Sequence, residues 1–199
     1  HIAKLIGTYE QPLHPHIDRI INSSYKKVIN IGCAEGYYAT GLALRMHNSK
    51  VLAYDTNTEA QEACINLVKK NNVTEKVTVS GHLAIEDLTE QLLEEAVIFC
   101  DIEGGELDLL DPEKAPALKN VDIIVEAHEC LIPGITDTLK NRFKDTHDVT
   151  EVRDDGMRSF ENPPEWFSQF AHLDQLLATW EWREGPTPWL VMTRELINS

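Results

Sequence analysis

Acidic residues and a histidine follow short apolar segments, where their types and spacing could support chemistry. The segment Ala96–Cys100 runs into Asp101-Ile102-Glu103-Gly104-Gly105-Glu106, which gathers three carboxylates within six residues. Like charges this close repel unless a cation lies nearby, so we expect a cationic cofactor group or a divalent metal beside Asp101. Glu106 is expected only to complement the N-terminal dipole of the next helix.

A second acidic site follows the next apolar segment, which ends Val125-Glu126-Ala127-His128-Glu129. Glu126 and His128 are two residues apart, so in an extended chain they share a face. If that face borders a cleft, both meet Asp101 across neighbouring strands. A histidine at a strand end is usually only structural, and here its acidic neighbours make a functional role equally plausible.

Two hypotheses for this cluster remain open. His128 could act as a general base that a carboxylate orients. Alternatively, Asp101 and Glu126 could hold Mg²⁺ or Mn²⁺, which would lower the pKa of a hydroxyl group. The acids outnumber the single imidazole, which slightly favours the metal. We therefore assign Asp101, Glu126 and His128 as catalytic candidates, with Asp101 and Glu126 as metal ligands.

A glycine-bearing turn, Gly32-Cys33-Ala34-Glu35-Gly36-Tyr37-Tyr38, follows the first apolar segment. Small residues let the backbone approach a ligand, and the start of the following helix offers free N–H groups. A dinucleotide-binding turn needs the pattern G-x-G-x-x-G, but Ala34 and Tyr37 occupy the second and third glycine positions. This departure argues against NAD.

Asp55 ends the second apolar segment, 23 residues after Gly32. An acidic side chain at this place accepts hydrogen bonds from both ribose hydroxyls of a nucleoside cofactor. The alternative is that Asp55 caps the helix that begins near Glu59, and we favour the ligand role.

Short apolar runs alternate with amphipathic stretches, which is typical of βαβ units around a parallel sheet. The expected strands are Lys27–Ile31, Val51–Tyr54, Val77–Ser80, Ala96–Cys100, Val121–Glu126, Asp148–Val152 and Pro188–Thr193. The expected helices are His16–Ile21, Tyr37–Met46, Glu59–Lys70, Ile85–Glu95, Glu106–Ala117 and Ile135–Phe143. Thr56 and Asn57 can cap the third of these helices, and Asn71-Asn72 end it.

We expect one domain over residues 1–199, with two additions to the sheet. Residues 1–25 form an N-terminal cap that either closes the cofactor site from the side or packs on the sheet edge. The irregular, aromatic-rich stretch Arg153–Glu184 separates the last two strands. It is either a lid over a binding cleft or a surface subdomain.

Composition excludes several classes of protein. The formal net charge is −15, which disfavours a phosphate backbone as partner. No apolar run is long enough to span a membrane. The four cysteines are widely spaced, which favours reduced thiols in a cytoplasmic protein. The first residue is His1 rather than Met, so a lost targeting segment remains possible.

Three motifs in order resemble FkbM-type methyltransferases: VINIGCAEGYYATGLA at Val28–Ala43, DIEGGE at Asp101–Glu106, and VEAHE at Val125–Glu129. The resemblance covers Gly7 to Glu129 well and Gly185–Thr193 more loosely. It implies a Rossmann-like class I α/β fold, with a seven-stranded, mostly parallel sheet, helices on both faces and an antiparallel last strand. It also implies S-adenosylmethionine as cofactor and methylation of a hydroxyl oxygen on a sugar or another small molecule.

The resemblance also assigns cofactor contacts. The turn from Gly32 to Tyr38 would wrap the methionine part, Asp55 would hold the ribose, and His82 to Ala84 would border the adenine. The sequence departs from the class at Asn30, where an acid is usual, so the contact with the cofactor's ammonium would be weaker. The full expected set is Asn30, Gly32, Cys33, Ala34, Gly36, Tyr37, Tyr38, Asp55, Thr56, His82, Ala84 and Asp101.

Two other classes of function remain open at this point. A nicotinamide-dependent oxidoreductase would share the fold and Asp55 but lacks the glycine pattern. A catalytically silent S-adenosylmethionine-binding protein would keep the motifs of the first two strands. The sequence specifies neither the acceptor nor the oligomeric state.

Overall fold

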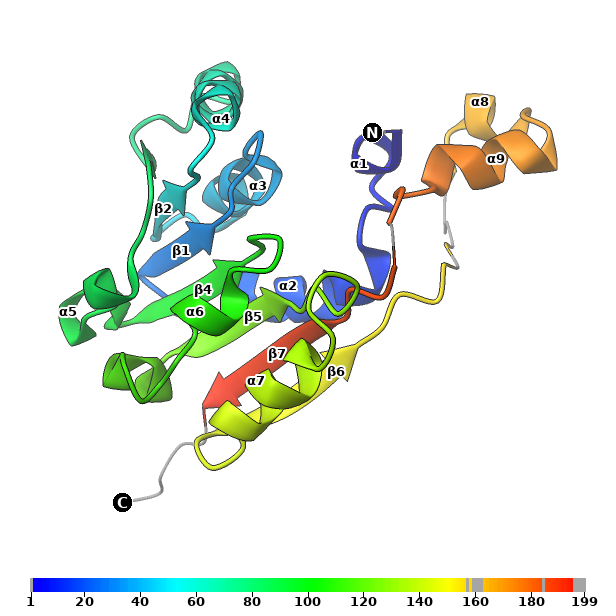
Figure 1. The fold of residues 1–199 in the computed structure, drawn as a ribbon. Coiled ribbons are helices and arrows are strands. Elements are labelled where there is room, and N and C mark those ends of the chain that lie inside the picture. The colour runs from blue at the N-terminus through cyan, green and yellow to red at the C-terminus, as the bar shows by residue number, and fades with distance from the viewer. Residues whose placement is uncertain (1, 157, 159–162, 184, 195–199) are drawn as a thin grey trace.

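Seven strands form one mixed sheet in the computed structural model, which describes residues 2–156, 158, 163–183 and 185–194. The strand order is β3-β2-β1-β4-β5-β7-β6. The five strands from β3 to β5 are parallel, whereas β7 is antiparallel to both β5 and β6 (Figure 1). The expected mostly parallel sheet with an antiparallel last strand is confirmed.

The strands lie close to their expected positions. Their bounds are β1 Lys27–Ile31, β2 Lys50–Tyr54, β3 Val77–Ser80, β4 Ala96–Cys100, β5 Asp122–Glu126, β6 His147–Val152 and β7 Trp189–Arg194. The chain begins the sheet at β1 and adds β2 and β3 on one side. It then crosses over and adds β4 and β5 on the other side, so the strand order switches direction between β1 and β4. Ligands of open α/β sheets bind at such a switch point, outside the carboxyl ends of the strands.

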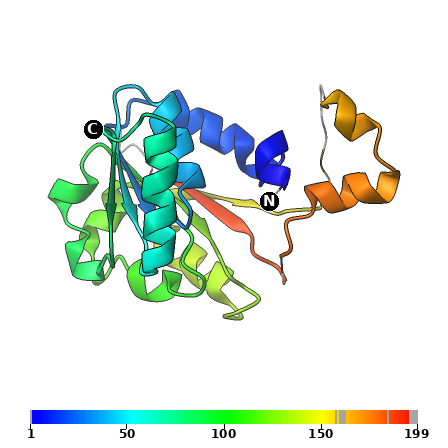
Figure 2. The ribbon, with the colours of Figure 1, turned by 90° about the horizontal axis from the view of Figure 1, so that it is seen from above.

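Helices cover both faces of the sheet (Figure 2). On one face lie α2 (His14–Ile21), α3 (Tyr37–Arg45) and α4 (Thr58–Lys70). On the other lie α5 (Glu90–Leu93), α6 (Glu106–Leu109) and α7 (Ile135–Phe143). Among the described residues, no helix has the length and apolar character needed to cross a bilayer.

Side chains alternate between two apolar layers because successive residues of a strand face opposite sides. Ile29 and Ile98 belong to the buried cluster that includes Leu139 of α7. Val28 and Phe99 belong to the second cluster, with Leu42 of α3. Burial on both faces explains why these strands read as continuous apolar runs.

Two expected helices are much shorter than predicted. Ile85–Glu95 is replaced by a 3₁₀ turn at Ile85–Asp87 and by α5, because extended Thr89 interrupts the helix and caps α5, its Oγ1 accepting from Leu92 N at 3.3 Å. Glu106–Ala117 ends at Leu109. Pro112 lacks an N–H group and disfavours helical backbone at the residue before it, so the chain continues as a 3₁₀ turn at Pro116–Asn120.

The N-terminal segment and the stretch between β6 and β7 meet at one end of the sheet (Figures 1 and 2). Helix α1 (Ile2–Ile6) precedes α2, and the stretch after β6 contains two short helices, α8 (Glu165–Ser168) and α9 (His172–Thr179). Helices α8 and α9 project beyond the sheet, and α9 lies beside α1. We call residues 153–188 the insert.

Candidate active site

The turn between β1 and α3 is shaped by residues in left-handed conformation: Gly32 (φ 77°), Ala34 (φ 46°) and Gly36 (φ 90°). A Cβ atom at Gly32 would lie 1.6 Å from the backbone oxygen of Asp101, so only glycine lets the turn approach the end of β4. The amide of Ala34 donates to Asp55 Oδ2 at 2.9 Å. Asp55 therefore fixes the unusual backbone of this turn.

A cavity of about 770 Å³ lies at the carboxyl ends of β1, β2, β3 and β4, and we call it the turn cavity. Seven of the twelve expected cofactor-binding residues line it: Gly32, Ala34, Asp55, Thr56, His82, Ala84 and Asp101. Residues from four separate loops thus meet in one cavity, as the order of strands predicted.

Asp55 is not the cap of α4, because Asn57 holds that place. The Asn57 side chain accepts from the amides of Glu59 and Ala60, at 2.8 and 3.3 Å. Asp55 Oδ1 instead accepts from Asn57 N at 2.9 Å. An ionised carboxylate has about four acceptor positions, so Asp55 keeps capacity for a ligand that enters the cavity.

Five expected cofactor residues do not line this cavity: Asn30, Cys33, Gly36, Tyr37 and Tyr38. Gly36 is explained by packing, because a Cβ atom there would lie 2.6 Å from Cys64 Sγ of α4. Helix α3 packs on one face of the sheet, so the side chains of its first residues lie outside the turn cavity. Tyr38 is half-buried against Phe99 and Trp189, and its hydroxyl donates to Glu10.

Asn30 is almost fully buried on β1, just before the turn. Its Nδ2 donates weakly to the Phe99 carbonyl at 3.5 Å, and its Oδ1 has no hydrogen-bond partner in the described chain. A buried carbonyl without a donor is unfavourable by about 1–3 kcal/mol. An acceptor therefore stays open at the position where the resemblance expects a cofactor contact.

Asp101, Glu126 and His128 converge, as predicted from their places at neighbouring strand ends. His128 Nε2 lies 3.6 Å from Asp101 Oδ1 and 3.8 Å from Glu126 Oε2. These residues line a cavity of about 400 Å³, which we call the carboxylate cavity. Its described lining also includes Tyr9, Glu10, Glu103, Cys130, Leu131, Glu181, Trp182, Arg183 and Thr187.

Glu106 does more than complement a helix dipole, which corrects the expectation from the sequence. It is fully buried at the start of α6, and its Oε1 lies 2.7 Å from His128 Nδ1. Burial opposes ionisation, but the hydrogen bonds from His128 and from backbone amides, together with the charge of His128, outweigh it and lower the pKa of Glu106. A carboxylate only accepts, so Nδ1 carries the proton and Nε2 faces the cavity as an acceptor.

Burial and charge perturb the other titratable groups of the cavity. Burial disfavours the charged imidazole, yet the bond to Glu106 and the charge of Glu126 raise the pKa of His128. Burial and repulsion by Glu126 raise the pKa of Asp101 to about 8. The same two causes raise the pKa of Glu10 to about 7. These raised pKa values bring the protonation of Asp101 and Glu10 into the neutral range, and protonation relieves the repulsion among these acids.

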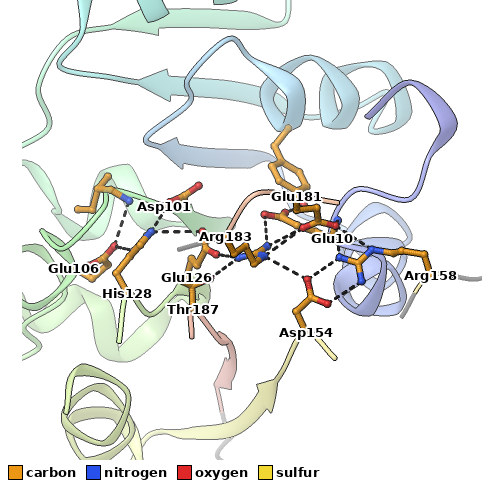
Figure 3. A network of polar contacts seen from close by, with 12 residues as sticks. Glu10, Asp101, Glu106, Glu126, His128, Asp154, Arg158, Glu181, Arg183 and Thr187 are labelled. Carbon is orange, nitrogen blue, oxygen red and sulfur yellow. Dashed lines mark hydrogen bonds and ion pairs between the residues drawn. The ribbon is translucent and has the colours of Figure 1, made fainter. Parts of the chain in front are cut away.

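A network of ion pairs links the carboxylate cavity to the insert (Figure 3). Arg183 contacts Glu126, and its guanidinium also lies 3.2 Å from Glu10, 3.2 Å from Glu181 and 3.4 Å from Asp154. Arg158 pairs with Asp154 at 2.7 Å and with Glu181. Sequence reasoning missed these residues because they come from segments without periodicity or a motif.

The expected metal ligands are close enough together to hold an ion. One ligand atom each from Asp101, Glu126 and His128 lie within 4.8 Å of one another. However, Arg183 already pairs with Glu126 Oε1. One oxygen of Glu126 is therefore taken by Arg183, and the choice between a metal and a general base stays a prediction.

Comparison with known proteins agrees with this geometry. Residues 18–107 match the family model described as O-methyltransferase. No curated protein matches the chain. Among solved structures, the O-methyltransferase TomG from Streptomyces achromogenes, in complex with SAM, is 13% identical with a TM-score of 0.57, covering 94% of this chain and 80% of that one. The fold is that of class I methyltransferases.

Two more solved structures support the same fold. The O-methyltransferase from Bacillus cereus, in complex with SAH, is 13% identical with a TM-score of 0.57, over 94% of this chain and 81% of that one. A precorrin-6y C5,15-methyltransferase from Geobacter metallireducens is 13% identical with a TM-score of 0.57, over 92% and 87%. The family match supports methyl transfer to a hydroxyl, whereas the FkbM-type subfamily finds no support here.

Proposed function

We propose that this protein transfers a methyl group from S-adenosylmethionine to a hydroxyl oxygen of a small acceptor. The observation that carries the proposal is the junction of the two cavities. The turn cavity and the carboxylate cavity share Asp101 and Glu103 in their walls. A cofactor in the first would therefore present its reactive end to His128 in the second.

The turn cavity fits the cofactor on three counts. Gly32 leaves no Cβ between the turn and the end of β4, so the backbone itself forms the wall. Asp55 offers a carboxylate at the end of β2 for the ribose hydroxyls. Just outside the lining, buried Asn30 Oδ1 lacks a donor within the described chain, which a cofactor ammonium would supply through water. Gly32, Ala34, Asp55, Thr56, His82, Ala84 and Asp101 are therefore our proposed contacts.

His128 is the proposed general base. When bound, S-adenosylmethionine supplies an activated methyl group and a sulfur leaving group. Nε2 takes the proton from the acceptor hydroxyl as its oxygen bonds to the methyl carbon. Glu106 holds the proton on Nδ1 and stabilises the imidazolium that forms, and its burial fixes the ring orientation. The protein otherwise positions the reactants and excludes water.

The charge of the carboxylate cavity limits the chemical class of the acceptor. Five carboxyl groups, from Glu10, Asp101, Glu103, Glu126 and Glu181, line the carboxylate cavity together with the guanidinium of Arg183. Acceptors that carry phosphate or several carboxylates would be repelled, whereas neutral polyhydroxyl or amine-bearing molecules would not. A sugar acceptor, an FkbM-type membership and a cytoplasmic location agree with this proposal and stay predictions.

Binding of the cofactor is tested with one variant and one control. Asp55→Ala should weaken S-adenosylhomocysteine binding at least tenfold in calorimetry, because charged hydrogen bonds are worth about 1.5–3 kcal/mol each. Asp145→Ala, an exposed acid after α7, should leave the affinity unchanged. Unchanged affinity in a folded Asp55→Ala protein, or stabilisation by NAD rather than S-adenosylhomocysteine, would contradict the proposal.

Turnover needs a separate test, because a catalytically silent binding protein would also give the binding results expected above. We expect turnover to S-adenosylhomocysteine with a panel of neutral and amine-bearing hydroxyl acceptors. Cofactor binding without turnover on any fraction of a metabolite extract would instead support the silent binding protein.

A further inference from the structure

Arg183 lies where the insert returns to the sheet, six residues before β7 begins at Trp189. Its side chain is only 20% exposed. Four acidic side chains from three parts of the chain face its guanidinium: Glu126 at the end of β5, Glu10 of the N-terminal segment, and Asp154 and Glu181 of the insert (Figure 3). These acidic side chains together hold the Arg183 guanidinium in a fixed position.

That position adjoins the place a divalent ion would need. The candidate metal ligands are Asp101, Glu126 and His128, and Glu126 is the member that Arg183 contacts. Glu126 uses Oε1 for Arg183, while Oε2 lies 3.8 Å from His128 Nε2. A divalent ion on Glu126 would thus adjoin a guanidinium that the surrounding acids hold in place, and the two cations would repel each other.

We propose that Arg183 is the resident cation of the carboxylate cavity and that it excludes a divalent metal from Asp101, Glu126 and His128. Arg183 is then a positioning residue. Its charge balances Glu126 and keeps that carboxylate beside His128 Nε2, where it favours the protonated imidazole that methyl transfer would generate. This catalytic role rests on the proposed function, whereas the exclusion of metal does not.

The experiment measures Mn²⁺ binding by electron paramagnetic resonance in the full chain, without cofactor or acceptor. Arg183→Met should create a Mn²⁺ site at least tenfold tighter than any in the wild type, because it frees Glu126 while keeping a side chain of similar length. Adding Glu126→Gln to this variant should abolish the new site, which separates it from weak binding elsewhere on an acidic surface. Arg183→Lys should not create the site, because the cation remains.

Arg153→Met is the matched control. Arg153 also belongs to the insert, but its side chain is 81% exposed and pairs with Glu151, so its loss should create no tight site. A second measurement needs no variant at Arg183. Mn²⁺ should leave the imidazole proton resonances of His128 sharp in the wild type, with His128→Gln used to assign them.

Two results would overturn the inference. One is a wild-type Mn²⁺ site that broadens the His128 resonances. The other is a folded Arg183→Met protein, as judged by circular dichroism, that gains no site sensitive to Glu126→Gln. If Arg183→Met does not fold, the wild-type resonances decide. A protein that shows the expected Mn²⁺ pattern but never turns over S-adenosylmethionine would refute the proposed function and leave the exclusion of metal standing.

Discussion

The two neighbouring cavities are built in different ways. The turn cavity is walled by backbone and side chains at the ends of β1 to β4, each delivered by the loop that follows its own strand. The carboxylate cavity needs the ends of β4 and β5, the N-terminal segment and the insert. One site depends on local turn geometry, and the other on ion pairs between distant segments. Changes in one should therefore leave the other largely intact.

The largest effect should follow removal of the imidazole. His128→Gln takes away the base, so we expect kcat to fall about 10²- to 10⁴-fold. The dissociation constant for S-adenosylhomocysteine should not change, because His128 does not line the turn cavity. His47→Gln, an exposed histidine after α3, should alter neither quantity. Equal losses of binding and of turnover would show that the two cavities are one coupled site.

Glu106→Gln should have a smaller effect and should change the pH dependence. The imidazole must be neutral to accept a proton, so the wild-type rate should fall as pH drops through the raised pKa of His128, above its ordinary value near ~6.5. Glutamine can still accept the hydrogen bond from His128 but carries no negative charge, so the pKa of His128 should fall. The acid limb of the pH–rate profile, where the rate falls as pH drops, should therefore move to lower pH. The plateau rate should fall about 10- to 100-fold, as for other residues that orient a reacting group.

The control for this variant is Glu62→Gln, which removes the same charge from an exposed position on α4. Its pH–rate profile should match the wild type. An acid limb that stays in place in Glu106→Gln would mean that His128 is not the titrating base.

The smallest expected effect concerns the turn cavity and tests the backbone strain of its turn. Ala34 is a non-glycine residue in left-handed conformation, which costs about 1–2 kcal/mol for an L-residue. Ala34→Gly should raise the free energy of unfolding by about 0.5–1 kcal/mol in denaturant titration, after the greater unfolded-state entropy of glycine is subtracted. The same substitution in the middle of α4, at exposed Ala63 (Ala63→Gly), should lower it by about 1 kcal/mol. A loss of stability in both would show that Ala34 is not strained.

Sequence predicted the strands well because buried parallel strands read as short, continuous apolar runs. It also brought Asp101, Glu126 and His128 together, since parallel strands end at the same edge of the sheet. It failed at residues 85–95 and 106–117, where Thr89 and Pro112 interrupt helices that the apolar pattern alone would continue. In both segments, a helix cap or a proline interrupted a helix that the spacing of apolar residues predicted to continue.

The partners in the carboxylate cavity were beyond the reach of pattern reasoning. Glu106 looked like a helix-dipole residue because its other contact, His128, lies 22 residues away in sequence. Arg183 and Glu10 are separated by 173 residues, and nothing local to either marks the pair. Tyr38 lies outside the turn cavity for a different reason: the backbone of the turn borders the cavity, whereas the side chains of the following helix pack on one face of the sheet.

The insert begins and ends at adjacent points of the sheet, because Val152 of β6 and Trp189 of β7 are register partners. A loop anchored in this way can be lengthened, shortened or exchanged without disturbing the hydrogen-bonding ladder beneath it. Yet this loop carries Arg183, the charge that balances Glu126. Replacement of the insert between related sequences would therefore change the charge balance of the carboxylate cavity in one evolutionary step, while the strand ends that form the turn cavity stayed the same.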